Sequence, residues 1–245
     1  MRSKHVVGVL LISMLLLGDQ LAFSESKNDQ VITVAEDVDG ERNVHVLSVT
    51  EAYDYAFSLE QKDLSSRAVP FYEAIIAEKP DHSDAHARLA YIFYMNKQYD
   101  KAQQECEWKI AREPNDCQAN FFMGMIYQYG REDASGALKY YEQAVNYCEG
   151  HPKAAALEFS GDIYQLALHD WDKAIEYYRL ILKIQSNNVK AHFNLGACLA
   201  NKGQLDEAVV EFKEVISKAQ NSDHPELYEK ALEAVTAVEN ARKGK

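Results

Sequence analysis

The sequence predicts an all-α protein built as an α-solenoid, in which helix pairs stack one after another along the chain. Five alanines lie 34, 35, 37 and 34 residues apart, each a few residues before a bulky side chain: Ala68, Ala102, Ala137, Ala174 and Ala208. Apolar residues recur from residue 49 to residue 238 with the roughly 3.6-residue period of an α-helix. A repeat of about 34 residues with two helices is typical of units that bury their apolar faces only against their neighbours.

The first segment of the chain predicts export. A basic start, a short apolar run over residues 6–17 and a small-x-small site at residues 22–24 are typical of a secretory signal peptide, which we expect over residues 1–24. The run is shorter than the roughly 20 residues of a membrane span, and an uncleaved membrane anchor is the alternative.

Residues 25–48 differ in character from the rest of the chain. β-branched residues on both sides of Asp39-Gly40 could form a small hairpin. A flexible tether is the favoured interpretation, because two isolated strands are only marginally stable in water.

Five repeat units are expected between residues 49 and 222, each made of two antiparallel amphipathic helices. Gly196 of the last unit lies where the two helices must approach closely, and Phe212 belongs to the apolar stripe of its second helix. Additional residues near 131–135 and near His169 lengthen two of the spacings and are assigned to loops. The expected units are 49–82, 83–116, 117–152, 153–188 and 189–222.

One more amphipathic helix follows within residues 223–245 and has no partner helix. Its apolar stripe can cover the open end of the last unit, while its polar face meets water. We therefore expect a capping helix followed by a short tail.

The repeats resemble the tetratricopeptide repeat family. The resemblance is carried by G-A-C-L…G-Q-L-D-E-A…E-F in the fifth unit and by L-A-Y-I-F…Q-Y-D-K-A…P-N in the second, and it covers residues 49–222. It implies a right-handed superhelix whose concave wall is lined by the first helix of each unit. Some members grip a partner's terminal carboxylate with basic and asparagine side chains. That clamp is not supported here, because its positions hold Tyr53, Phe57, Arg88, Gln118 and Phe122.

The residues expected on this wall change from aromatic to polar along the chain. The first three units supply Tyr53, Phe57, Tyr91, Tyr94, Met95, Phe121, Met125 and Tyr129, and the last two supply Glu158, Asp162, Gln165, Lys190, Asn194 and Asn201. Aromatic side chains give a large contact area with little entropy to lose, so we expect an apolar or amphipathic segment of a protein partner at the aromatic end. The competing interpretation is that these aromatics pack between adjacent units.

The four cysteines show no C-x-x-C spacing, which argues against a zinc ribbon or a thioredoxin-like site. Cys117 begins the first helix of the third unit and Cys148 ends the second, so an antiparallel pair of helices brings them together as a candidate disulfide. Cys106 and Cys198 are expected to be buried as small apolar groups.

No catalytic constellation is found in the sequence, which contains no nucleophile elbow, phosphate-binding glycine loop or H-E-x-x-H motif. His82 and His86 have a spacing that can chelate a metal, but His82 precedes its helix and no third ligand is nearby apart from Asp81 or Asp84. We therefore expect a protein that is not an enzyme and that takes neither a metal nor another cofactor.

Charge excludes one class of partner. Without residues 1–24 the chain carries 24 basic and 37 acidic residues, a net charge of −13, so binding to nucleic acid is not expected. Together these observations predict a periplasmic or secreted scaffold of the bacterial cell envelope that binds a protein partner, in the assembly of an envelope complex. The alternative is a structural protein that self-associates or stays tethered to the membrane by its N-terminus.

Overall fold

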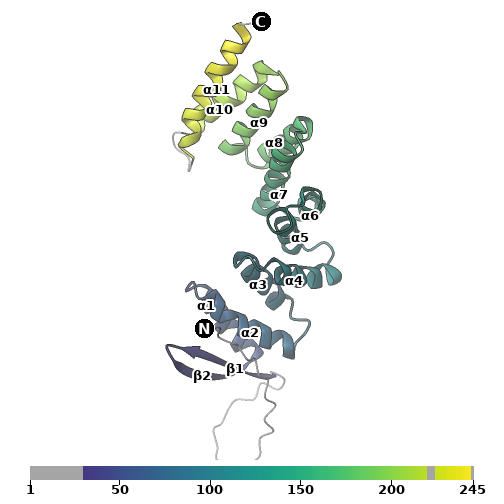
Figure 1. Cartoon of the computed structure of the whole chain (residues 1–245), viewed down its shortest axis with the longest axis vertical. Coiled ribbons are helices and arrows are strands. Elements are labelled where there is room, and N and C mark those ends of the chain that lie inside the picture. Colours follow the sequence, from purple (N-terminus) through teal and green to yellow (C-terminus); the bar gives the residue numbers. More distant parts are fainter. Residues whose placement is uncertain (1–29, 220–223, 244–245) are drawn as a thin grey trace, which may run out of the picture. The chain divides into compact units, whose positions relative to one another are not determined.

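A computed structural model describes residues 30–219 and 224–243, so the predicted signal peptide lies outside the described residues. Within these ranges the chain is an all-α solenoid of helix pairs preceded by one β-hairpin (Figure 1). It divides into two compact units, residues 1–109 and 110–245. None of the helices within the described residues combines the length and the hydropathy that a membrane span requires.

Residues 31–48 form an antiparallel hairpin of β1 (Val31–Val38) and β2 (Glu41–Ser48). Asp39 and Gly40 both have positive φ, at 53° and 85°, as a two-residue hairpin turn requires. Ile32 and Val34 are buried, and the hairpin packs on the first two helices. The flexible tether favoured from the sequence is therefore wrong, because these helices supply the apolar surface that an isolated hairpin lacks.

One carboxylate ties the hairpin to the helices. Glu36 on β1 accepts hydrogen bonds from His45 Nε2 at 3.0 Å and from the Tyr55 hydroxyl at 3.1 Å. It also accepts from Nε and Nη2 of Arg67, each at 3.1 Å. The Glu36 side chain is only 7% exposed, and these polar partners offset its loss of water.

The four helices that follow the hairpin are α1 (Val49–Glu60), α2 (Ser65–Glu78), α3 (Ser83–Met95) and α4 (Tyr99–Arg112), and the division between the two units falls inside α4. The start of α1 is fixed by a capping box, in which Ser48 accepts from the Glu51 amide and the Glu51 carboxylate accepts from the Ser48 amide. Phe71, Tyr72 and Ile75 of α2 are fully buried and form the centre of this part of the core.

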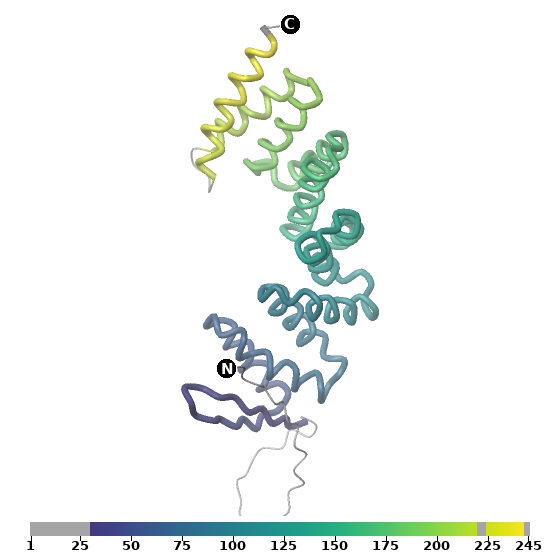
Figure 2. The backbone as a smooth tube through the Cα atoms, in the orientation of Figure 1, coloured from purple at the N-terminus to yellow at the C-terminus, as the bar shows by residue number. Residues whose placement is uncertain are grey.

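In the second unit each helix packs against the next one along the chain (Figure 2). The elements are α5 (Cys117–Met125) with η1 (Ile126–Gly130), α6 (Ala134–Tyr147), α7 (Gly150–Asp162) with η2 (Ile163–Ala167), α8 (Trp171–Ile184), α9 (Val189–Asn201), α10 (Leu205–Ala219) and α11 (Glu226–Lys243). Short polar side chains set the helix starts, since Asp116, Asp133, Asp170 and Asn188 each accept from a backbone amide three residues later.

Two details differ from the sequence interpretation. The helix α7 begins at Gly150, three residues before the expected start of the fourth unit. The additional residues of the third and fourth units are also not confined to loops, because α5 and α7 end in the π-helical turns η1 and η2. In these wider turns the amides of Arg131 and Leu168 donate to carbonyls five residues earlier, at Ile126 and Ile163.

Glycines set the distance between the two helices of a pair in the second unit. A Cβ atom added to Gly124, Gly161 or Gly196 would lie 2.4, 2.9 or 2.9 Å from the nearest ring atom of Tyr141, Tyr178 or Phe212, respectively. All three rings are buried on the second helix of the pair. Each glycine therefore makes room for an aromatic side chain that fills the core of its unit.

The last helix, α11, packs on α10 and α9 and buries Leu227, Ala231 and Val238. The intervening residues between these three are mostly exposed. This is the arrangement of a cap, which covers the apolar edge of the last helix pair with one face and meets water with the other.

Candidate functional site

The first-helix aromatics of α1 are engaged within the first unit. The Tyr53 ring packs edge-on against Tyr72 with centroids 5.6 Å apart, and it stacks with His82 at 5.5 Å. The Phe57 ring carries the Arg88 guanidinium over its face at 4.5 Å. Both side chains are partly buried, so they contribute more to packing within the unit than to its exposed surface.

The end of α3 is more open. Tyr91 is 37% exposed and Met95 is 59% exposed, one turn apart on the same helix. Tyr94 is half-buried, and its ring lies 5.9 Å from that of Tyr99 at the start of α4. Tyr91 and Met95 are therefore the exposed large apolar side chains of this helix.

Within residues 110–245, two of the three predicted aromatic-end residues, Phe121 and Met125, take part in packing. The Phe121 ring lies 5.9 Å from Tyr141 and 5.8 Å from Phe159, and Met125 packs against the same cluster. Tyr129, in η1, is 49% exposed and touches Phe159 only edge-on at 6.2 Å. The packing interpretation therefore describes Phe121 and Met125, whereas Tyr129 faces solvent.

The predicted polar residues of the fourth and fifth units form a cluster centred on Asp162. The Tyr178 hydroxyl lies 2.7 Å from Asp162 Oδ1 and 2.7 Å from Gln165 Oε1. Asn194 Nδ2 donates to the same Asp162 oxygen at 3.3 Å. Burial raises the pKa of the Asp162 carboxyl, against the opposing effects of the Tyr178 hydrogen bond and the Lys190 charge. Asn201, by contrast, is exposed and donates to the Ala197 carbonyl of its own helix.

Lys190 joins this cluster from α9. Its ammonium group donates to Glu158 Oε1 and lies 3.8 Å from Asp162 Oδ2. Desolvation lowers the pKa of Lys190, but the Glu158 hydrogen bond and the charges of Glu158 and Asp162 outweigh it and raise the pKa overall. The pKa of Tyr129 is raised by desolvation and then by the Asp162 charge, and its ring contacts Phe159, which follows Glu158 in the sequence.

The sequence interpretation missed one residue of this surface. Leu166, in η2, is 69% exposed, the largest exposure of any bulky apolar side chain in the described residues. It lies 37 residues after Tyr129, the same separation as Ala137 and Ala174, so it occupies the equivalent position of the next repeat. Counting the repeat period from Tyr129 would have identified it.

Cys117 and Cys148 are joined by a disulfide that connects the first residue of α5 to the residue that follows α6. The bond closes the open end of this helix pair. Cys106 and Cys198 are both buried, and burial raises the pKa of the Cys198 thiol to about 12. A thiol of this kind acts as a small apolar group and is a poor nucleophile.

The two histidines with chelating spacing have structural contacts instead. His82 Nδ1 accepts from the Ala85 amide at 3.2 Å and caps α3. His86 is buried, with Nδ1 2.6 Å from Glu105 and Nε2 3.2 Å from the Pro80 carbonyl. Among the described residues no three potential ligands are gathered for a metal ion.

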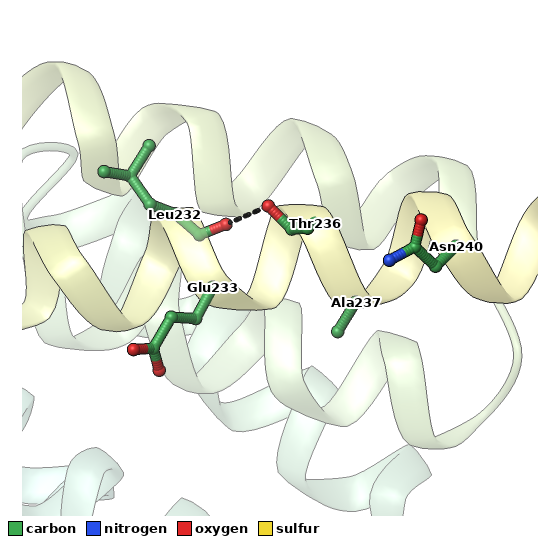
Figure 3. Close-up of a pocket in the computed structure, with 5 residues that line it drawn as sticks. All are labelled: Leu232, Glu233, Thr236, Ala237 and Asn240. Carbon is green, nitrogen blue, oxygen red and sulfur yellow. Dashed lines mark hydrogen bonds between the residues drawn. The ribbon is translucent and has the colours of Figure 1, made fainter.

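A shallow depression of about 450 Å³ lies on α11, lined by Leu232, Glu233, Thr236, Ala237 and Asn240 (Figure 3). The Thr236 hydroxyl donates to the Leu232 carbonyl of the same helix at 2.9 Å. Because one helix supplies all the lining, the depression brings together no convergent polar groups of the kind that bind a small molecule.

Comparison with known proteins agrees with this architecture. A TPR repeat-containing protein of Methanocaldococcus jannaschii is 26% identical over 202 residues, which are 80% of this chain and 34% of that protein. The chain thus spans about a third of that relative's length. Similar solved folds include MamA, with 20% identity over 70% of this chain and 92% of that one and a TM-score of 0.62. They also include PilW, described as a type IV pilus biogenesis factor, with 18% identity over 80% and 93% and a TM-score of 0.60.

A third similar fold is YrrB, described as a TPR protein with an unusual peptide-binding site, with 18% identity over 76% of this chain and 92% of that one and a TM-score of 0.60. The tetratricopeptide repeat profile matches residues 59–116 and 165–236 of this chain, which are 58 and 72 residues and together 130 of 245. The match covers more than half of the sequence, and the chain belongs to the tetratricopeptide repeat family.

Proposed function

We propose that this protein is a non-enzymatic adaptor of the bacterial cell envelope that holds an apolar or amphipathic segment of a protein partner on the first helices of its repeats. The observation that carries the proposal is the exposure of large apolar side chains at first-helix positions, with Tyr91 at 37%, Met95 at 59% and Tyr129 at 49%. Tyrosine is enriched among the few residues that carry most of the binding energy of protein interfaces, and methionine is enriched in their cores. The peptide-binding site named for YrrB supports the same use of this fold.

The cellular setting is part of the proposal. The N-terminal sequence has the pattern of a signal peptide, and the Cys117–Cys148 disulfide suits an oxidising compartment such as the periplasm. PilW, a fold of the same kind, is described as a type IV pilus biogenesis factor. We therefore place the protein outside the cytoplasm, where it would act in the assembly of an envelope complex.

Site-specific photo-crosslinking tests the binding surface directly. A photoreactive phenylalanine analogue is introduced at Tyr91 or Tyr129 in the organism that makes the protein, and irradiated cells are analysed for crosslinked species. Tyr147 on α6 is the matched control, because it is an aromatic residue of similar exposure, 47%, on a second helix. We expect a crosslinked protein from Tyr91 and Tyr129 that is absent from Tyr147.

Equal crosslinking from all three positions, or none from Tyr91 and Tyr129, would contradict the proposed surface. Crosslinks that contain only a second copy of this chain would instead favour the self-associating structural protein.

A further inference from the structure

Within the unit of residues 110–245, two π-helical turns present one exposed apolar side chain each. Tyr129 in η1 is 49% exposed and Leu166 in η2 is 69% exposed, at equivalent positions of consecutive repeats. π-Helical turns are uncommon and frequently occur at functional sites. Each turn therefore exposes one large side chain, Tyr129 or Leu166, that no helix covers among the described residues.

The charged side chains of this region comprise more carboxylates than ammonium groups. Glu158 and Asp162 share one cation, Lys190, which is within ion-pair distance of both carboxylates and is the only such cation among the described residues. The cluster therefore has two negative charges and one positive charge. All three side chains are partly exposed, at 28%, 22% and 43%, so a ligand can reach them.

The carboxylate oxygens on the side of the cluster that faces Lys190 can accept further hydrogen bonds. Oδ1 of Asp162 is the atom held by Tyr178 and Asn194, whereas Oδ2 has only the ammonium at 3.8 Å. Glu158 uses Oε1 for Lys190. A planar guanidinium carries five donors and can meet a carboxylate with two parallel hydrogen bonds while it stacks on an aromatic ring. The Tyr129 ring packs edge-on against Phe159, the residue that follows Glu158, with the ring centroids 6.2 Å apart.

Charge complementarity therefore selects the occupant of this face. Resting on the proposed function, we infer that the face formed by Tyr129, Leu166, Glu158 and Asp162 binds a peptide segment of the partner in which an arginine lies between apolar residues. The arginine offsets the unpaired negative charge, and the apolar residues cover Tyr129 and Leu166. Burial raises the pKa of Asp162, and the charge of a second cation would offset part of the cost of keeping this carboxylate ionised.

The test is selection from a displayed library of random 12-residue peptides against the purified full chain. We expect the selected pool to be enriched in arginine flanked by apolar residues, relative to the input library. A synthesised member of the pool should bind roughly three- to tenfold more tightly than its twin in which citrulline replaces arginine, because citrulline keeps the shape and loses the charge.

Two charge variants make the test specific to this face. Glu158→Gln should remove most of the arginine preference, whereas Glu149→Gln changes the net charge by the same amount at an exposed residue before α7 and should leave the preference unchanged. Equal effects of the two variants would show attraction to an acidic protein in general and would overturn the inference.

The outcomes also separate the inference from the proposed function. A pool enriched in apolar residues with no preference for arginine would overturn the inference and leave the adaptor function standing. A pool identical to the input would contradict both. Circular dichroism of each variant confirms that a lost preference does not come from unfolding.

Discussion

The packing between the two helices of a repeat makes a sharp prediction at Gly124. This glycine lies inside α5, and a methyl group at its Cα would lie 2.4 Å from Cδ1 and 2.5 Å from Cε1 of Tyr141. The ring cannot swing away easily, because it is fully buried, stacks on Phe159 at 5.5 Å and holds Gln128 through its hydroxyl at 2.7 Å. Gly124→Ala should therefore overpack the third unit.

Two effects of opposite sign decide the magnitude. Replacing glycine by alanine inside a helix stabilises it by about 1 kcal/mol through backbone entropy. Overpacking a filled core costs about 1 to 3 kcal/mol, and a contact well below van der Waals distance belongs at the upper end of that range. We expect the free energy of unfolding to fall by about 1 to 2 kcal/mol net, measured by urea unfolding followed by circular dichroism.

A double variant isolates the cause. With Tyr141→Leu already present, the ring is gone, and Gly124→Ala should be neutral or stabilising by up to about 1 kcal/mol. The chain itself pairs an alanine with a small residue in this way, since Ala90 and Cys106 lie 34 and 35 residues earlier, at the equivalent positions of the repeat over residues 83–116. If Gly124→Ala were harmless in the wild-type protein, or equally costly in both backgrounds, the argument from close approach would be refuted.

Three further predictions concern the ends and the crosslink of the chain. Glu36→Gln should lower the free energy of unfolding by about 1.5 to 3 kcal/mol, because Arg67 loses its charged acceptor. Desolvation raises the pKa of Glu36, but its hydrogen bonds outweigh this effect, so the pKa in the folded state is lowered. The contribution of Glu36 to stability is therefore present above its unfolded-state pKa and is lost as the pH falls through its folded-state pKa. Unfolding experiments from about pH 7 to pH 3 should show this loss in the wild type and not in Glu36→Gln. Cys117→Ser with Cys148→Ser should cost about 3 to 4 kcal/mol for the lost 31-residue crosslink, and a double variant that melts like the wild type would contradict this. Removing residues 224–243 should uncover apolar surface of α9 and α10 at about 25 cal/mol per Å² and cause aggregation, whereas unchanged light scattering would show that α11 is not a cap.

The sequence predicted on which helices the residues of the candidate site lie, but not which of them are packed and which are exposed. The repeat period places Tyr91, Phe121 and Tyr129 on first helices, which the structure shows. It does not say that Phe121 lies between Tyr141 and Phe159 while Tyr129 stays exposed, because both residues follow the same helical pattern. The difference comes from contacts with rings of other helices, and single-helix periodicity contains no information about these.

The solenoid follows from the amino-acid sequence alone. Its five regularly spaced alanines, the glycines opposite bulky residues and the apolar stripes of α9, α10 and α11 are local and repeated, and a repeated unit that packs only on its neighbours leaves little choice of fold. Features that depend on contacts between residues distant in sequence are visible only in the folded chain. The hairpin packs on the first two helices and Glu36 contacts Arg67 across 31 residues, while in the polar cluster Asn194 contacts Asp162 across 32. Neither contact follows from a periodic pattern, since each depends on the exact position of side chains from separate elements.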